Sequence, residues 1–203
     1  YQGPSMFKKK DNLVGLDVGS HVIKMIHVRQ RDSTLRLLNL GLVPIPRDAF
    51  AEGRITKPSV VASTIQRLAG SLKLKGKSAA TSISGYEVMI KKIELPMMTE
   101  QELADRMYLE LGQYIPYNID EVEVDFQVLD IAKDRSNYMD VLLVAAKKES
   151  VSDCLAVARM GGLEPVVVDV DFFALSNAYE ATHGLAGDQN ILLLDIGASK
   201  STM

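Results

Sequence analysis

The sequence is poor in the residues that build disulfide frameworks and zinc sites. Its 203 residues include one cysteine and three histidines. Cys154 cannot form an internal disulfide, which is typical of a reducing compartment, and the apolar helical pattern around it predicts a buried thiol. His21, His27 and His183 show no metal-ligand spacing, so zinc catalysis is not expected.

Long hydrophobic runs and a surplus of basic residues are also missing. No apolar stretch approaches the roughly 20 residues of a membrane-spanning helix, and no signal-peptide core opens the chain. The net charge is −3, from 23 basic and 26 acidic residues, with one basic run at Lys8–Lys10. We therefore expect a cytoplasmic protein that does not bind nucleic acid.

What remains is the composition of an ordinary globular protein. Hydrophobic residues make up 47% of the chain and charged residues 24%, which excludes a disordered polypeptide. Residues 1–5 precede Met6 and look like the remnant of an expression tag. The length is compatible with one large domain or with two joined subdomains.

Hydrophobic periodicity predicts an α/β layer that is interrupted by an α+β insert. For the first layer we predict strands over 13–18, 21–28, 35–43 and 78–83 and a helix over 58–68. For the insert we predict strands over 87–95, 121–128 and 138–146, a helix that begins at a capping box over 99–102, and a helix over 150–160. The strand over 121–128 has an acidic outer face and should bulge at Leu129. The chain then returns to the first layer with a strand over 164–168, a helix over 171–182 and a strand over 190–194.

One short sequence motif occurs twice, and the functional prediction depends on it. Asp17 and Asp195 each end an apolar strand and are followed by an apolar residue, a glycine and a small residue, 178 positions apart. Such a turn gathers a carboxylate and several backbone N–H groups in a small volume. One copy alone would equally be an ordinary tight turn. Two copies that face each other would hold a metal-bound polyphosphate.

The pair of turns resembles the two phosphate loops of the actin-like ATPase and sugar-kinase superfamily. In its first loop a lysine follows the aspartate by seven positions, which corresponds here to Lys24 (17 + 7 = 24), although an exposed hairpin lysine would also fit. The position of the insert resembles the FtsA branch. Within that branch, residues 16–20, 93–96 and 114–122 resemble the PilM family of type IV pilus assembly, and the likeness runs from about residue 13 to residue 202.

The resemblance implies an actin-like (ribonuclease H-like) α/β fold with ATP and Mg²⁺ between two halves. Residues 6–84 and 162–189 would form subdomain 1A, residues 85–161 the inserted α+β subdomain 1C of FtsA type, and residues 190–203 the start of a second half whose remainder is absent. Asp17 and Asp195 would hold the metal ion. The other implied nucleotide contacts are Gly19, Ser20, Lys24, Gly197, Ala198, Ser199 and Lys200. The second loop departs from the Gly-Gly-Gly-Thr that the superfamily often has.

Two acids at the start of the helix predicted over 171–182 are candidates for orienting an attacking water. Related ATPases place a polar group there, and the resemblance points to Asp171 and, second, to Asp169. An acid at a helix N-terminus is also stabilised by the helix dipole without any catalytic role, so both interpretations stay open. The resemblance implies weak ATPase activity at most.

PilM-like proteins bind the short N-terminal cytoplasmic tail of the membrane protein PilN. We expect a PilN-like partner here, attachment through it to the inner face of the cytoplasmic membrane, and self-association as a further option. The acidic strand face and Met97–Met98 are candidate contacts, although the methionines could equally pack within the fold. An FtsA-like division filament protein and a sugar or small-metabolite kinase are the alternative functions.

Overall fold

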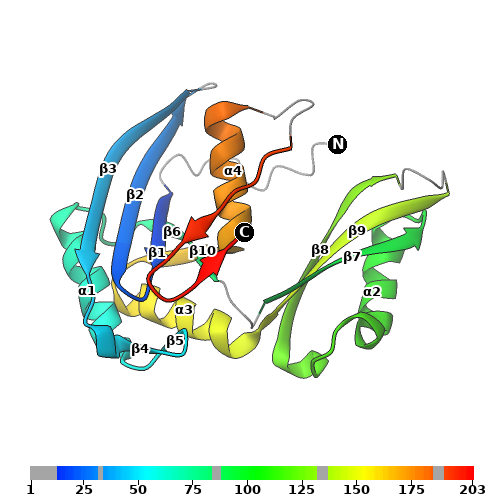
Figure 1. The fold of residues 1–203 in the computed structure, drawn as a ribbon, viewed down its shortest axis with the longest axis horizontal. Helices are drawn as coiled ribbons and strands as arrows, with labels where there is room; N and C mark the ends of the chain where they lie inside the picture. Colours follow the sequence, from blue (N-terminus) through cyan, green and yellow to red (C-terminus); the bar gives the residue numbers. More distant parts are fainter. Residues whose placement is uncertain (1–12, 32–33, 84–87, 132–136, 185–189) are drawn as a thin grey trace. The chain divides into compact units, whose positions relative to one another are not determined.

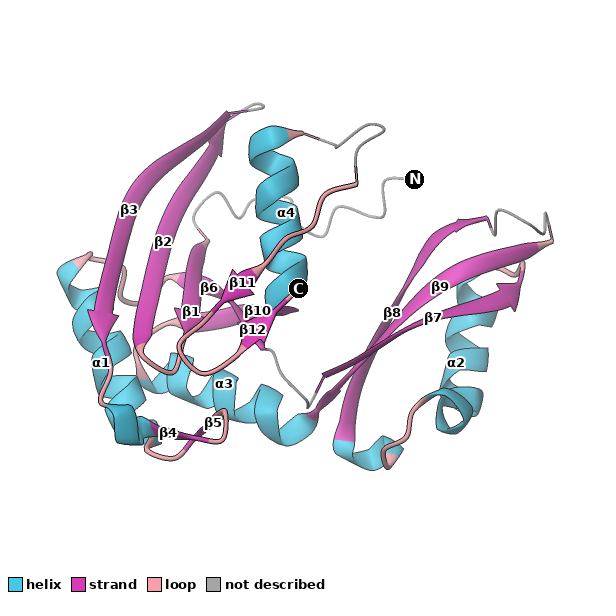
Figure 2. Ribbon diagram, viewed as in Figure 1, coloured by secondary structure: helices cyan, strands magenta, loops and turns pink. Residues whose placement is uncertain are grey.

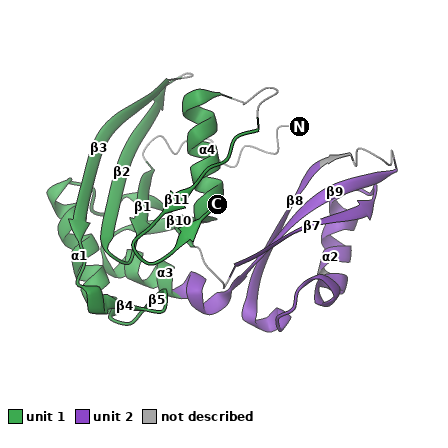
Figure 3. Ribbon diagram, in the orientation of Figure 1, with its two compact units in different colours: residues 1–83, 153–203 green, residues 84–152 purple. Residues whose placement is uncertain are grey.

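The computed structural model describes residues 13–31, 34–83, 88–131, 137–184 and 190–203. The chain divides into two compact units, unit 1 with residues 1–83 and 153–203 and unit 2 with residues 84–152 (Figure 3). Each unit has its own hydrophobic core. The predicted tag remnant (1–5) and the basic run (8–10) lie outside the described residues, and the subdomain assignments stay predictions.

Unit 1 is built on a five-stranded mixed sheet with the order β10-β6-β1-β2-β3 (Figure 2). β1, β6 and β10 are parallel, whereas β1, β2 and β3 form an antiparallel meander. The strands are β1 (Val14–Val18), β2 (Val22–Arg31), β3 (Thr34–Pro44), β6 (Ser78–Ile83) and β10 (Glu164–Val170). Parallel neighbours need crossover connections. The chain between β3 and β6 contains α1 (Pro58–Ser71), and α3 (Lys148–Met160) precedes β10.

The core of unit 1 lies between this sheet and the helices α1 and α3. Alternate residues of β2, Ile23 and Met25, are fully buried and pack in one cluster with Val61 and Ile65 of α1 and Val157 of α3. Full burial of one such side chain contributes about 1.5–3 kcal/mol. The first hairpin is thereby anchored in the sheet.

The opposite side of β2 and β3 is apolar and exposed. Ile26 and its cross-strand partner Leu40 are 42% and 55% exposed, and Leu35, Leu37 and Leu42 extend the same surface. The helix α4 (Asp171–His183) packs against β6 and β10 (Figure 1). An antiparallel pair with one face in water normally carries polar residues on that face, and this face is apolar instead. Within the described residues, the burial of β2 and β3 is therefore incomplete.

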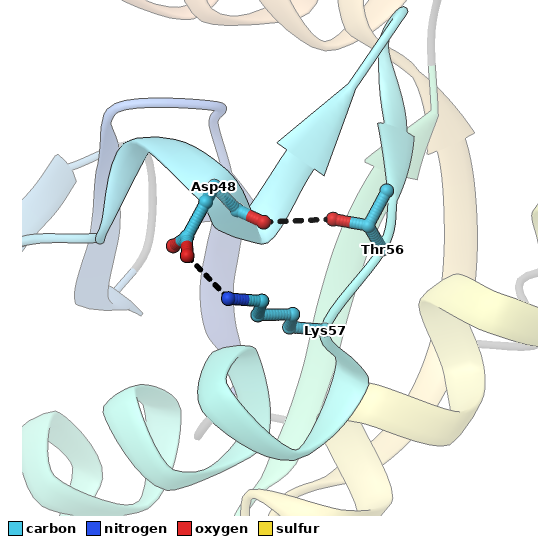
Figure 4. Close-up of polar contacts among 3 residues, drawn as sticks. All are labelled: Asp48, Thr56 and Lys57. Atoms are coloured by element: carbon cyan, nitrogen blue, oxygen red, sulfur yellow. Dashed lines mark hydrogen bonds and ion pairs between the residues drawn. The ribbon is translucent and has the colours of Figure 1, made fainter.

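A small hairpin that the sequence analysis does not predict joins β3 to α1. It consists of η1 (Arg47–Ala49), β4 (Phe50–Ala51) and β5 (Arg54–Ile55). Lys57 pairs with the Asp48 carboxylate, and Thr56 Oγ1 donates to the Asp48 carbonyl oxygen over 2.9 Å (Figure 4). The hydrogen bond from Lys57 lowers the pKa of Asp48. These contacts link η1 to the residues that lead into α1.

Unit 2 is a three-stranded antiparallel sheet with the order β7-β9-β8 and one long helix. Its elements are β7 (Val88–Pro96), α2 (Glu100–Tyr114), η2 (Ile119–Glu121), β8 (Val122–Ile131) and β9 (Tyr138–Lys147). The predicted capping box is confirmed: Thr99 Oγ1 accepts from the Glu102 backbone N–H over 3.3 Å, and Glu102 Oε2 accepts from the Thr99 N–H over 2.8 Å. On α2, Leu103, Met107 and Leu111 share one helix face and are buried.

β8 has the two-faced pattern that the sequence predicts. Val124 and Phe126 pack against the core of unit 2, while Glu123 and Asp125 are exposed. The register shifts between Val128 and Asp130, which confirms the bulge predicted at Leu129.

The strand predicted over 190–194 is wrong. These residues form no strand, and the ladder starts only with β11 (Asp195–Ile196), which pairs with β12 (Ser201–Thr202). A strand requires a hydrogen-bonded neighbour. The apolar run from Ile191 to Leu194 has none among the described residues, and Leu192 is 71% exposed.

The buried thiol is confirmed. Cys154 lies in the interior of unit 1, 3.4 Å from Thr81 Oγ1, and burial raises the pKa of its thiol. A thiol with a raised pKa is a poor nucleophile at neutral pH.

Candidate functional site

The first acidic turn joins β1 to β2. Asp17 is the cross-strand partner of Lys24, and Lys24 Nζ donates to Asp17 Oδ2 over 2.7 Å. The spacing of seven residues thus has a simple structural meaning. A turn with four residues between its innermost paired residues places the lysine directly opposite the acid.

The second acidic turn repeats this register. Asp195 pairs with Thr202 across β11 and β12, and 202 − 195 equals 24 − 17. Four residues separate the innermost paired residues in both hairpins, Val18 from Ile23 and Ile196 from Ser201. Thr202, which the sequence analysis did not single out, therefore stands where the first hairpin has Lys24. The seven-residue spacing is the signal that could have found it.

Each turn folds closely around its glycine. A Cβ atom at Gly19 would lie 2.8 Å from the Val22 carbonyl oxygen, and one at Gly197 would lie 2.8 Å from the Lys200 carbonyl oxygen. The Gly197 N–H donates to that oxygen over 2.9 Å. Contacts this short exclude an unstrained side chain. Glycine is thus required at both positions by the same geometry.

The two hairpins meet through their serines. Ser20 Oγ and Ser199 Oγ are 2.8 Å apart, although the residues are separated by 179 positions in the sequence. In Figure 1, β11 and β12 lie in front of the sheet close to the β1–β2 turn. The structure therefore brings together the two turns that the repeated motif singled out. The roles of their residues stay predictions.

The carboxylates of the region act together on Lys24. The hydrogen bond to Asp17 is the largest cause that raises the pKa of Lys24; partial burial opposes it, and the charges of Asp17, Asp195 and Asp171 add to the rise. The ammonium of Lys24 therefore stays charged at neutral pH in a field of three acids.

Asp169 and Asp171 occupy different environments. Asp169 is the penultimate residue of β10, and its Oδ1 accepts from the Val170 backbone N–H over 2.7 Å. Asp171 is the first residue of α4, and its charge reaches Lys24. Of the two candidates for orienting water, Asp171 is the one whose charge reaches the paired hairpins.

The remaining predicted residues lie in the second turn. Ala198 and Lys200 are exposed between β11 and β12, and the Lys200 carbonyl closes the turn. Among the described residues, no three His, Cys, Asp or Glu side chains gather to form a metal site. Two carboxylates suit Mg²⁺, which keeps several waters and often binds through one or two carboxylates and substrate phosphates. The carboxylates of Asp17 and Asp195 and the two glycine turns therefore fit a metal-bound polyphosphate.

The chain is similar to proteins of pilus assembly and secretion. The family described as type IV pilus assembly protein PilM matches residues 15–203. A chain of the PilM–PilN type IV pilus biogenesis complex is 29% identical with a TM-score of 0.80, covering 93% of this chain and 56% of that one. The cytoplasmic domain of EpsL, an inner membrane component of the type II secretion system of Vibrio cholerae, is 16% identical with a TM-score of 0.50, covering 80% and 58%. This chain thus spans somewhat more than half the length of these two relatives.

A membrane span requires a minimum length and hydrophobicity of a helix, and none of the helices of the described residues meets both.

Proposed function

The chain belongs to the PilM family of type IV pilus assembly proteins and has an actin-like ATPase fold, and from this premise we propose that it binds ATP with Mg²⁺ between its two acidic hairpins. The observation that carries the proposal is the 2.8 Å contact between Ser20 Oγ and Ser199 Oγ. It brings two turns of the same register, each with an acid and a closely packed glycine, to one place.

The hairpins supply complementary groups for a charged polyphosphate. Asp17 and Asp195 hold the Mg²⁺ directly or through water, as this ion prefers. Backbone N–H groups of the glycine turns and the hydroxyls of Ser20 and Ser199 bind phosphate oxygens. The Lys24 ammonium offsets the negative charge of the phosphates.

Asp171 is the residue we assign to orienting water, if the bound nucleotide is hydrolysed. It begins α4 and acts electrostatically on Lys24, which belongs to the phosphate-binding hairpin. Asp169 is committed to the backbone of Val170. Partner binding does not require hydrolysis, because ATP binding alone can change the affinity for a partner.

The ATP site is tested by calorimetric titration of the complete gene product with Mg-ATP. Asp17→Ala and Asp195→Ala should each lower the affinity by at least about tenfold, because each removes a metal ligand. Asp153→Ala, at an exposed acid of α3 in the same unit, is the control and should bind as the wild type does. Affinities within twofold of the wild type in both hairpin variants would refute the proposal.

We further propose that the protein is a cytoplasmic scaffold that docks on the N-terminal tail of a PilN-like inner-membrane protein. The support is the similarity to a PilM chain in a PilM–PilN complex. In unit 2, Glu123 and Asp125 form an exposed acidic row on β8 that would attract basic tail residues.

The two candidate methionines differ in their surroundings. Met97 is 53% exposed, whereas Met98 packs against the core of unit 2, so Met97 alone stays a candidate contact. A Glu123→Lys/Asp125→Lys double variant should bind an immobilised PilN-like tail peptide more weakly than the wild type. If the peptide retains the double variant and the wild type equally, β8 is not part of the docking surface.

A further inference from the structure

The ion pair of the first hairpin occupies the carboxylate that the proposed metal ion would use. Lys24 Nζ lies 2.7 Å from Asp17 Oδ2. In the second hairpin, the neutral Thr202 stands in the same register position opposite Asp195. The two acids of the proposed site are therefore not equivalent. Asp17 is paired with the ammonium of Lys24 on the neighbouring strand, and Asp195 faces a neutral residue.

This contact sets the ammonium and a divalent cation in competition. The Asp17 carboxylate has acceptor sites besides the one that Lys24 uses, so the ion pair does not close it to a metal ion, but two cations close to one carboxylate repel each other. A polyphosphate changes the balance, because its oxygens carry more negative charge than one carboxylate and accept strong hydrogen bonds from an ammonium.

We propose that Lys24 couples the two ligands by exchanging partners. In the free protein the Lys24 ammonium weakens metal binding at Asp17, and when ATP binds the ammonium moves to the phosphates, so that Asp17 can hold Mg²⁺ without this repulsion. The inference rests on the proposed nucleotide site and adds that Lys24 transfers to the phosphates before Asp17 holds Mg²⁺. Metal and polyphosphate must then raise each other's affinity by the same factor.

The exposure of the pair allows such an exchange. The side chains of Lys24 and Asp17 are 54% and 49% exposed, so the lysine can swing without disturbing the core. Exposed ion pairs are weak. The ammonium should therefore reduce the metal affinity of the free protein by only about two- to fivefold.

The test measures two affinities in separate titrations, one for a metal ion alone and one for Mg-ATP. Mn²⁺ is titrated into the nucleotide-free complete gene product and followed by electron paramagnetic resonance, and Mg-ATP is titrated by calorimetry. Lys24→Met should bind Mn²⁺ about two- to fivefold more tightly and Mg-ATP about tenfold more weakly than the wild type. Effects of opposite sign are the signature, since a merely structural role would weaken both.

Controls separate the exchange from changes in folding and in overall charge. Lys24→Gln should behave as Lys24→Met does, and Lys24→Arg, which keeps the positive charge and can still donate to a carboxylate or a phosphate, should stay closer to the wild type than either of them in both titrations. Lys57→Met removes another exposed lysine that is paired with an acid, Asp48, and should change neither affinity.

Two outcomes would overturn the exchange. Unchanged Mn²⁺ binding in both Lys24→Met and Lys24→Gln would make Lys24 a plain phosphate ligand, and weakened Mn²⁺ binding would make it a support of the metal site. Failure of the proposed function would look different, because ATP binding would then be insensitive to Asp17→Ala and Asp195→Ala as well.

Discussion

The two acidic hairpins of unit 1 share a register but differ in their surroundings. The β1–β2 hairpin belongs to the five-stranded sheet, and its Ile23 is completely buried. The β11–β12 hairpin has two residues in each strand, and its Ile196 is 73% exposed. Both nevertheless place a glycine Cβ position 2.8 Å from a carbonyl oxygen. The turn geometry is thus local, whereas stability comes from packing.

The largest expected effect of this difference is on the free energy of unfolding. Ile23→Ala should lower it by about 2–5 kcal/mol, because the substitution removes a fully buried side chain and leaves a cavity. Ile196→Ala should change it by less than about 0.5 kcal/mol, because this side chain is exposed. Urea unfolding of the 203-residue chain, followed by circular dichroism, measures both. Similar losses in the two variants would show that the second hairpin is packed as firmly as the first.

A smaller effect is expected at the two glycines. Gly19→Ala should cost about 1–3 kcal/mol, because the sheet on both sides prevents the turn from relaxing around the new Cβ atom. Gly197→Ala strains its turn in the same way but should lower the free energy of unfolding by less than about 0.5 kcal/mol, because the short exposed hairpin can rearrange locally while the core stays packed. Gly112→Ala in α2 is the control.

A Cβ atom at Gly112 would meet nothing closer than 3.7 Å, so alanine should stabilise this helix by up to about 1 kcal/mol. The same urea titrations report all three values. Equal destabilisation at Gly19 and Gly197 would contradict the contrast between the hairpins.

Features that depend on neighbouring residues could be predicted from the sequence. The capping box of Thr99 and Glu102 is confirmed, as is the bulge at Leu129, because each follows from a pattern of a few residues. The position of Lys24 was predicted only by resemblance, yet its cause is also local. Asp17 and Lys24 face each other because four residues lie between the innermost pair of the hairpin, Val18 and Ile23.

Features that depend on distant residues could not be predicted from the pattern alone. The strand predicted over 190–194 is wrong because an apolar run becomes a strand only beside another strand. The β4–β5 hairpin was missed because its turn has positive φ angles at Glu52 (51°) and Gly53 (80°), and glutamate does not indicate such a turn. The contact between Ser20 and Ser199 joins residues 179 positions apart, and only the repeated motif pointed to it.

The meeting of the two hairpins is tested most directly by a disulfide between them. In the double variant Ser20→Cys/Ser199→Cys, the 2.8 Å separation of the two Oγ atoms predicts that mild oxidation joins the new thiols. The native Cys154 is buried and should stay reduced. A Ser20→Cys/Ser63→Cys variant, with the second thiol on α1, is the control and should form no bridge. Mass spectrometry of the non-reduced digest should show the bridge between residues 20 and 199, whereas free thiols at both positions after oxidation would contradict the convergence of the two hairpins.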